Sequence, residues 1–99
     1  MKIVDIGVII AEREIDGYMD DKPCKVVVKI GKPFIEEADG SCWYCPYSIN
    51  APGNDRKFYG AGIDSLQALK LAISNIKAEL GSLYSSFRLS WNGETDLGF

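Results

Sequence analysis

The first half of the chain alternates apolar and polar residues, which is the period of a strand with one buried face. Residues 3–15 predict a first strand whose apolar positions are β-branched: Val4, Ile6, Val8 and Ile10. A polar turn follows over residues 16–22, and Pro23 can open a second strand because its missing N–H matters little at a first position. The apolar face of that second strand is formed by Cys24, Val26, Val28 and Ile30. The two strands predict an antiparallel hairpin.

A third strand is expected over residues 41–51, which are rich in aromatic side chains. Its core face would hold Trp43, Cys45, Tyr47 and Ile49, and its opposite face would hold Cys42, Tyr44, Pro46 and Ser48. Because proline donates no ladder hydrogen bond, Pro46 predicts a strand that lies at a sheet edge or is bulged at this point. A turn at residues 52–55 and a short fourth strand at residues 57–59 follow.

The apolar period changes from two to about three and a half at Asp64, which predicts a helix over residues 64–80. Its apolar stripe consists of Leu66, Leu69, Ile73, Ile76 and Leu80. Asp64 is a good N-cap, Gln67 stands at the position of the reciprocal capping-box partner, and Gly81 supplies a natural end. We expect this helix to lie across the apolar face of the sheet.

A last short strand is expected after the helix, because Phe87, Leu89 and Trp91 alternate with polar residues. Asn92 and Gly93 then form a turn, and residues 97–99 form a tail that folds back onto the body. The elements predict a single α+β domain over residues 1–99, in the order β-β-β-(β)-α-β. One helix packs on one face of an antiparallel sheet of four to five strands. A chain of 99 residues has room for one such core.

The formal net charge is −3, and the excess acid falls in two clusters. The first contains Glu12, Glu14, Asp16, Asp20 and Asp21, and the second contains Glu36, Glu37 and Asp39. Such clusters are common in solvated turns, or they complement a basic protein partner, since opposite charges accelerate encounter and fix orientation. The negative charge disfavours a nucleic-acid partner, although four lysines collect along one segment: Lys22, Lys25, Lys29 and Lys32.

Membrane and secretion signals are not found in this sequence. No apolar run reaches the roughly 18 to 20 residues that span a bilayer, and an acid follows the first residues before a signal-peptide core could form. We therefore expect a cytoplasmic protein with no membrane partner.

Three cysteines are the residues that suggest a metal or redox site. Cys42 and Cys45 have the C-x-x-C spacing of such sites, and Cys24 is a third thiol. A regular strand directs Cys42 and Cys45 to opposite faces, so they cannot chelate together. The chain has no histidine, which leaves a zinc site incomplete and removes the usual acid–base catalyst near neutral pH. We expect no metal, no cofactor, no disulfide framework and no enzymatic activity.

Residues 62–66, Gly-Ile-Asp-Ser-Leu, resemble the phosphopantetheine attachment site of acyl and peptidyl carrier proteins. That resemblance implies an acyl-carrier-like protein in which Ser65 carries the prosthetic arm, on a bundle of about four helices. The strand-like residues before the motif predict a different fold. We therefore expect the likeness to be fortuitous, because an N-cap aspartate before Ser-Leu recurs at helix starts.

A longer set of motifs resembles a family of small uncharacterised bacterial α+β domains. The motifs are Gly-x-Asp-Ser-Leu-Gln-Ala-Leu at residues 62–69, Leu-x-Trp at 89–91, Leu-Gly-Phe at 97–99 and Trp-x-Cys at 43–45. This resemblance implies an α+β fold and brings no activity, cofactor or catalytic residue with it. In size and charge the chain is also similar to immunity proteins that neutralise bacterial toxins.

These observations favour a non-enzymatic binding protein, most specifically an immunity protein whose acidic loops occlude a basic toxin domain. Tyr44, on the outward face of the third strand, would add an aromatic anchor to the acidic residues, because aromatic side chains concentrate interface energy. The alternatives are a structural or regulatory subunit, dimeric through a sheet edge or its aromatic residues, and a carrier modified at Ser65.

Overall fold

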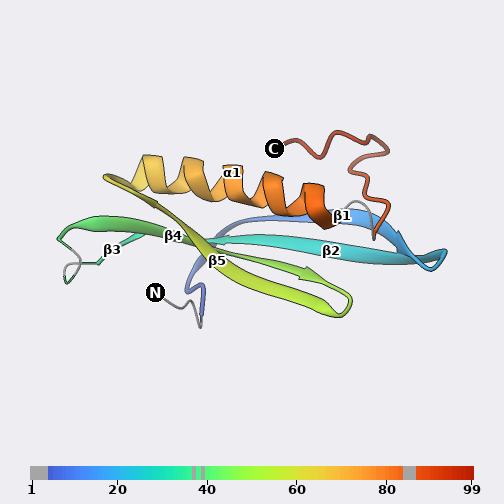
Figure 1. Cartoon of the computed structure of the whole chain (residues 1–99), viewed down its shortest axis with the longest axis horizontal. Helices are drawn as coiled ribbons and strands as arrows, with labels where there is room; N and C mark the ends of the chain where they lie inside the picture. The colour runs from blue at the N-terminus through green and yellow to red at the C-terminus, as the bar shows by residue number, and fades with distance from the viewer. Residues whose placement is uncertain (1–4, 37, 39, 84–86) are drawn as a thin grey trace.

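Five antiparallel strands precede one long helix in the computed structural model, which describes residues 5–36, 38, 40–83 and 87–99 (Figure 1). The strands are β1 (Ile9–Met19), β2 (Lys22–Gly31), β3 (Phe34–Glu36), β4 (Cys42–Ala51) and β5 (Asn54–Gly62), and the helix is α1 (Ser65–Leu83). The predicted α+β fold, with a helix on one face of an antiparallel sheet, is confirmed.

β4 is the central strand of the sheet. β5 pairs with it along residues 43–51. On the other side of β4, β2 pairs with residues 47–50 and β3 pairs with residues 42–44. β1 pairs with β2 and forms one edge of the sheet. The sheet is therefore four strands wide, with β2 and β3 in line at one position.

Pro46 predicted a sheet edge or a bulge, and both alternatives are wrong: β4 is paired on both sides, and its register with β5 runs through Pro46 without a shift. Pro46 lies opposite Tyr59 of β5. On its other side it falls in the gap between the residues that pair with β2 and those that pair with β3. The ladder is already interrupted at this gap, which lets a residue without a donor stand in a central strand.

The first hairpin turn is shorter than predicted. β1 continues past Asp16 and Gly17, and the turn contains only Asp20 and Asp21, whose φ angles are 53° and 61°. A two-residue hairpin turn requires such left-handed angles, which aspartate tolerates better than most residues. Gly17 lies inside the strand, where a Cβ would stand 3.2 Å from Leu89 Cδ2. Its small size makes room for the C-terminal segment.

The predicted alternation also fails where β1 begins. A bulge at Ile10 shifts the register with β2. Ile6 is buried as predicted, but Val8 and Ile10 are 70% and 49% exposed. Val4 lies outside the described residues. The apolar faces of the second and third strands are confirmed, and they supply Val26, Val28, Ile30, Cys45, Tyr47 and Ile49 to the core.

α1 lies over β4 and β5 on one face of the sheet (Figure 1). Its buried residues are Ala68, Ala72, Ile76 and Leu80. The predicted stripe is therefore correct at its C-terminal end and wrong at its start, where Leu66 is 72% exposed. The cause is Gly60 in β5, because a Cβ there would stand 2.3 Å from Ala72 N. The helix backbone rests directly on β5, so small alanines face the strand in place of leucine.

The predicted helix start is confirmed. The Gln67 N–H donates to Asp64 Oδ1 at 2.7 Å, and the Ile63 N–H donates to Gln67 Oε1 at 2.7 Å. These reciprocal bonds are the pattern of a capping box. The predicted end is wrong, because α1 passes through Gly81 to Leu83. One glycine costs a helix about 1 kcal/mol, which packing can offset.

The C-terminal segment packs beside β1 as an isolated bridge in place of the predicted strand. Phe87 and Leu89 are buried, and Ser90 forms a bridge with Asp16. The predicted turn at Asn92 and Gly93 is confirmed by φ angles of 51° and 78°.

Arg13 fastens the tail, which folds back as predicted. Its Nη1 donates to the carbonyl oxygens of Leu97 and Gly98 at 2.9 and 3.2 Å. Its guanidinium lies 3.9 Å from the ring centre of Trp91 and 5.0 Å from that of Phe99. Arg13 therefore binds the tail through both carbonyl and aromatic groups.

Candidate functional site

The described acids of the two clusters are spread along the length of the molecule, which measures 48 × 23 × 21 Å. Asp20 and Asp21 form the tip of the β1–β2 hairpin, whereas Glu36 ends β3 at the other end of the sheet (Figure 1). Glu37 and Asp39 lie outside the described residues. The described acids of the two clusters therefore do not share one surface.

Lysines of β2 neutralise part of the first cluster. Lys25 lies opposite Asp16 and forms an ion pair with it. The hydrogen bond from this ammonium to Asp16, together with the charge of that carboxylate, raises the pKa of Lys25. Lys29 lies opposite Glu12. Two of the four lysines that collect in the sequence, Lys25 and Lys29, are thus cross-strand partners of acids, whereas Lys22 lies opposite Met19.

Glu14 is the acid of β1 that faces an apolar neighbour. It lies opposite Val27, and no ion pair joins it to a cation of the described residues. Ile15 points into the core, and side chains alternate along a strand. Glu12 and Glu14 therefore project from the face of the sheet away from α1.

The outer edge of β1 is covered along part of its length. Asp16 exchanges two backbone hydrogen bonds with Ser90, at 2.9 and 2.8 Å, and the Arg88 N–H donates to Tyr18 O at 3.4 Å. Because these groups alternate in an antiparallel strand, the N–H and C=O of Glu14 and Glu12 point outward as well. Within the described residues, no backbone group pairs with this outer edge over residues 9–14. We call residues 9–14 the open edge.

Apolar side chains gather at the open edge. Ile9 and Ile10 are about half exposed, at 45% and 49%. A pocket of about 210 Å³ begins at the next residue, Ala11, and lies between β1, β2, α1 and the tail. Its lining residues include Ala11, Val28, Ile30, Ile73 and Phe99. Acidic and apolar groups thus meet at one exposed strand.

The expected exposure of Tyr44 is wrong. Tyr44 is 9% exposed. Its ring centre lies 5.8 Å from that of Phe34 and 5.0 Å from that of Tyr59. The described aromatic residue that stands exposed beside the acidic hairpin tip is Tyr18, whose ring lies 5.3 Å from the Arg88 guanidinium.

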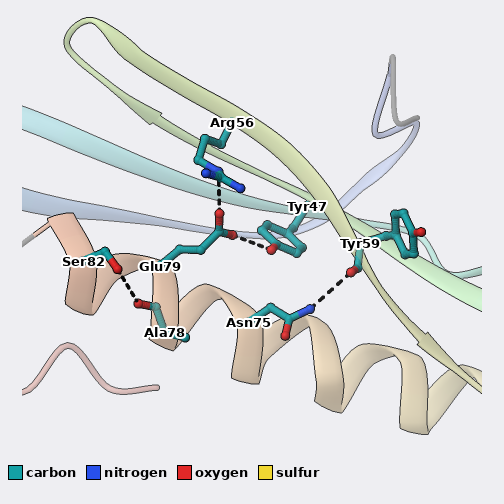
Figure 2. Close-up of polar contacts among 7 residues, drawn as sticks. All are labelled: Tyr47, Arg56, Tyr59, Asn75, Ala78, Glu79 and Ser82. Atoms are coloured by element: carbon teal, nitrogen blue, oxygen red, sulfur yellow. Dashed lines mark hydrogen bonds and ion pairs between the residues drawn. The ribbon is translucent and has the colours of Figure 1, made fainter. Parts of the chain in front are cut away.

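A polar seam joins α1 to the sheet (Figure 2). Tyr47 is fully buried and donates a hydrogen bond to Glu79 Oε2. Arg56 Nε lies 2.5 Å from Glu79 Oε1, but this ion pair lacks hydrogen-bond geometry, so Oε1 is buried without a hydrogen-bond partner in the described residues. Asn75 Nδ2 donates to Tyr59 O at 3.2 Å. Glu79 therefore faces the sheet, although it does not belong to the predicted apolar stripe.

The chemistry of this seam is that of a structural contact. Burial, and after it the hydrogen bond and charge of Glu79, raise the pKa of Tyr47 well above its ordinary value. Tyr47 thus stays protonated near neutral pH and keeps donating to the carboxylate. These contacts tie α1 to β4 and β5.

The three cysteines differ in burial and in their hydrogen-bond partners. All three thiols are free. Cys45 is buried and donates to Gly31 O, whereas Cys42 donates to Trp43 O and Gly62 O, each at 3.7 Å. Burial raises the pKa of Cys45 to about 11, so its thiol is unreactive near neutral pH. Among the described residues, no group of His, Cys, Asp or Glu side chains could hold a metal ion.

Ser65 is the first residue of α1 and is exposed. Its neighbours Asp64 and Gln67 form the capping box, which accounts for the carrier-like motif by local structure. The part of the chain that the structure describes contains no helix that is both long and apolar enough to cross a membrane.

Sequence reasoning missed the open edge, the pocket and the seam. The sequence held one signal for the open edge: Glu12 and Glu14 stand at alternate positions of a predicted strand, so both project from the same face. The pocket and the seam had no local signal, because both are formed by residues far apart in the sequence.

A search of curated proteins and a search of solved structures found nothing similar to the chain. A family profile matches residues 11–99, which include most of β1, the rest of the sheet, α1 and the tail. The family is described as a domain of unknown function (DUF6968). The expected membership of an uncharacterised domain family is confirmed: the chain belongs to the DUF6968 family.

Proposed function

We propose that this domain is a non-enzymatic binding protein that binds a basic protein partner through Glu12 and Glu14 of β1. The observation that carries this proposal is the open edge, where two exposed carboxylates lie next to exposed Ile9 and Ile10. Its most specific form is an immunity protein that neutralises a basic toxin.

Charge and apolar surface have separate roles at such a site. Exposed carboxylates attract a basic partner over a distance and orient it, which raises the association rate constant. Exposed isoleucines add contact area once the partner arrives. Asp16 contributes less to the attraction than the sequence suggests, because Lys25 neutralises it.

The test is to replace both carboxylates and measure association. A photo-crosslinking residue at Glu14 would capture the partner in cells, and the purified partner would then be bound to wild-type protein and to the double variant Glu12→Gln/Glu14→Gln. We expect association to slow by about tenfold at low salt, with a weaker salt dependence, since steering charges act mainly on this rate. The matched control is Glu94→Gln, an exposed acid outside the open edge.

Equal association rates for the double variant and wild type, or an equal loss in the control, would contradict the proposal. Relief of toxicity when this protein is co-expressed with the captured partner would support the immunity role, whereas a partner without toxicity would exclude that specific form. A dimer of the free protein that is lost in the double variant would favour the structural subunit instead.

A further inference from the structure

We propose that the open edge of β1 accepts an extended segment of the partner as an additional antiparallel strand. Basic side chains of that strand face Glu12 and Glu14, and an apolar side chain on its other face enters the pocket beside Ala11. This inference rests on the proposed binding of a basic protein and specifies how the partner docks.

The chain already uses the same edge in this way. Residues 88–90 lie along β1 in an antiparallel arrangement and exchange backbone hydrogen bonds with Asp16. Their neighbours Phe87 and Leu89 are buried on the core side. Arg88 points to the other side, where its Nη2 lies 3.0 Å from Asp21 Oδ1. The covered half of the edge therefore shows which sequence pattern fits it: apolar residues alternate with polar ones, and the polar residue Arg88 is basic.

The open edge continues this covered half as regular strand from Glu14 back to Ala11, and the bulge at Ile10 follows. The C-terminal segment leaves β1 after Trp91, where Asn92 and Gly93 turn the chain back. The remaining edge spans residues 9–14, which is roughly 20 Å of strand at about 3.3 Å per residue. A partner strand can follow the line of residues 88–90 and hydrogen-bond to the outward groups of Glu14 and Glu12.

The pocket gives the second face of the added strand a specific contact. Ala11, Glu12 and Arg13 all line it, so it opens at the edge strand itself. Its volume is about 210 Å³, larger than the roughly 150 Å³ that accommodates a benzene ring. One large apolar side chain of the partner fits this space. Strand addition gains affinity from backbone hydrogen bonds and specificity from such pockets.

A second copy of this chain fits the open edge less well. Two antiparallel β1 edges would bring Glu12 and Glu14 of both copies together on one face, and like charges on neighbouring strands repel. A strand with lysine or arginine at alternate positions meets the opposite charge instead.

The first experiment uses peptides as probes of the full chain. Binding is measured for a short peptide that alternates lysine with leucine, for the same composition with its lysines grouped together, and for the alternating peptide with N-methyl groups at alternate backbone amides. We expect the alternating peptide to bind about tenfold more tightly than the other two, because only it combines side-chain alternation with a complete set of backbone donors.

The second experiment separates backbone from charge at one residue. Glu14→Gln removes the carboxylate, whereas Glu14→Pro removes the carboxylate and the outward N–H while sparing the ladder to β2. We expect Glu14→Pro to bind the alternating peptide about five- to tenfold more weakly than Glu14→Gln. Circular dichroism of both variants checks that they fold. If Glu14→Pro does not fold, the N-methylated peptide provides the same comparison on wild-type protein.

The outcomes separate the two proposals. Equal binding of the N-methylated and unmodified peptides would overturn strand addition and leave charge-driven binding in place. If Glu14→Gln and Glu12→Gln also leave peptide binding and partner association unchanged, the proposed function fails as well. If the free protein forms a dimer and Glu14→Pro abolishes it, the open edge binds a second copy of this chain, and the proposal of a partner strand is wrong.

Discussion

Tyr47 is fully buried, and its hydroxyl donates to Glu79 Oε2 across the interface between helix and sheet. Glu79 is also ion-paired with Arg56, although its Oε1 accepts no hydrogen bond from the described residues. A buried carboxylate that loses a hydrogen-bond donor destabilises the fold, because neither water nor another donor replaces the lost bond. This single hydroxyl group therefore supports the attachment of α1 to the sheet.

Replacing Tyr47 tests that contact. We expect Tyr47→Phe to lower the free energy of unfolding by about 1–3 kcal/mol near neutral pH, because Glu79 Oε2 loses its donor. The raised pKa of Tyr47 means that the folded state holds this proton more tightly than the unfolded state. Its contribution is complete below about pH 10 and is lost as the pH rises further.

Urea unfolding at several pH values measures both effects. The alkaline loss of stability should be smaller in Tyr47→Phe than in wild type. Tyr18→Phe is the control, since Tyr18 is exposed. If Tyr47→Phe and this control have the same free energy of unfolding, the contact between Tyr47 and Glu79 does not stabilise the fold.

At the scale of elements, α1 and β5 approach so closely that glycine is required between them. A Cβ at Gly60 would stand 2.3 Å from Ala72 N and 2.5 Å from Ala68 O. Backbone atoms cannot rotate away as a flexible side chain could, so the helix would have to shift. The two glycines of the Gly-Ala-Gly segment before the helix thus serve packing and not chain flexibility.

Two substitutions of the same kind test this. We expect Gly60→Ala to lower the free energy of unfolding by at least about 2 kcal/mol, since the helix must move off the strand. Gly81→Ala, within α1 and in open space, should raise it by about 0.5–1 kcal/mol. Thermal unfolding of both variants measures the difference. Similar stability for Gly60→Ala and wild type would contradict the close approach.

The sequence predicted correctly those features that depend only on residues close together in the chain. The alternation of Val26, Val28 and Ile30 and the capping pair at Asp64 and Gln67 needed no tertiary information. Leu66 was predicted to be buried and is exposed. The face that α1 turns toward the sheet depends on its close approach to Gly60, a residue of β5, and the local sequence does not contain that information. The first strand was predicted over residues 3–15, whereas β1 runs from Ile9 to Met19. Its end was placed too early because Asp16 and Gly17 resemble a turn until the C-terminal segment is placed beside them.

At the scale of the whole molecule, folding redistributes the charges of the sequence. Asp16 and Glu12 of β1 became cross-strand neighbours of Lys25 and Lys29, and the described acids Asp21 and Glu36 lie at opposite ends of the sheet. Sequence composition could identify Glu12 and Glu14 as acidic but not that they lie beside an open backbone edge. That property depends on where residues 88–90 stop covering β1.

Amide hydrogen exchange of the free protein tests the open edge most directly. The amides of Arg13 and Ile15 pair with β2, and that of Asp16 pairs with Ser90 O, so these should be protected. The outward amides of Glu12 and Glu14 should exchange at least about tenfold faster than that of Asp16. Protection of Glu12 and Glu14 equal to that of Asp16 would mean that the edge is already covered, which would contradict the account.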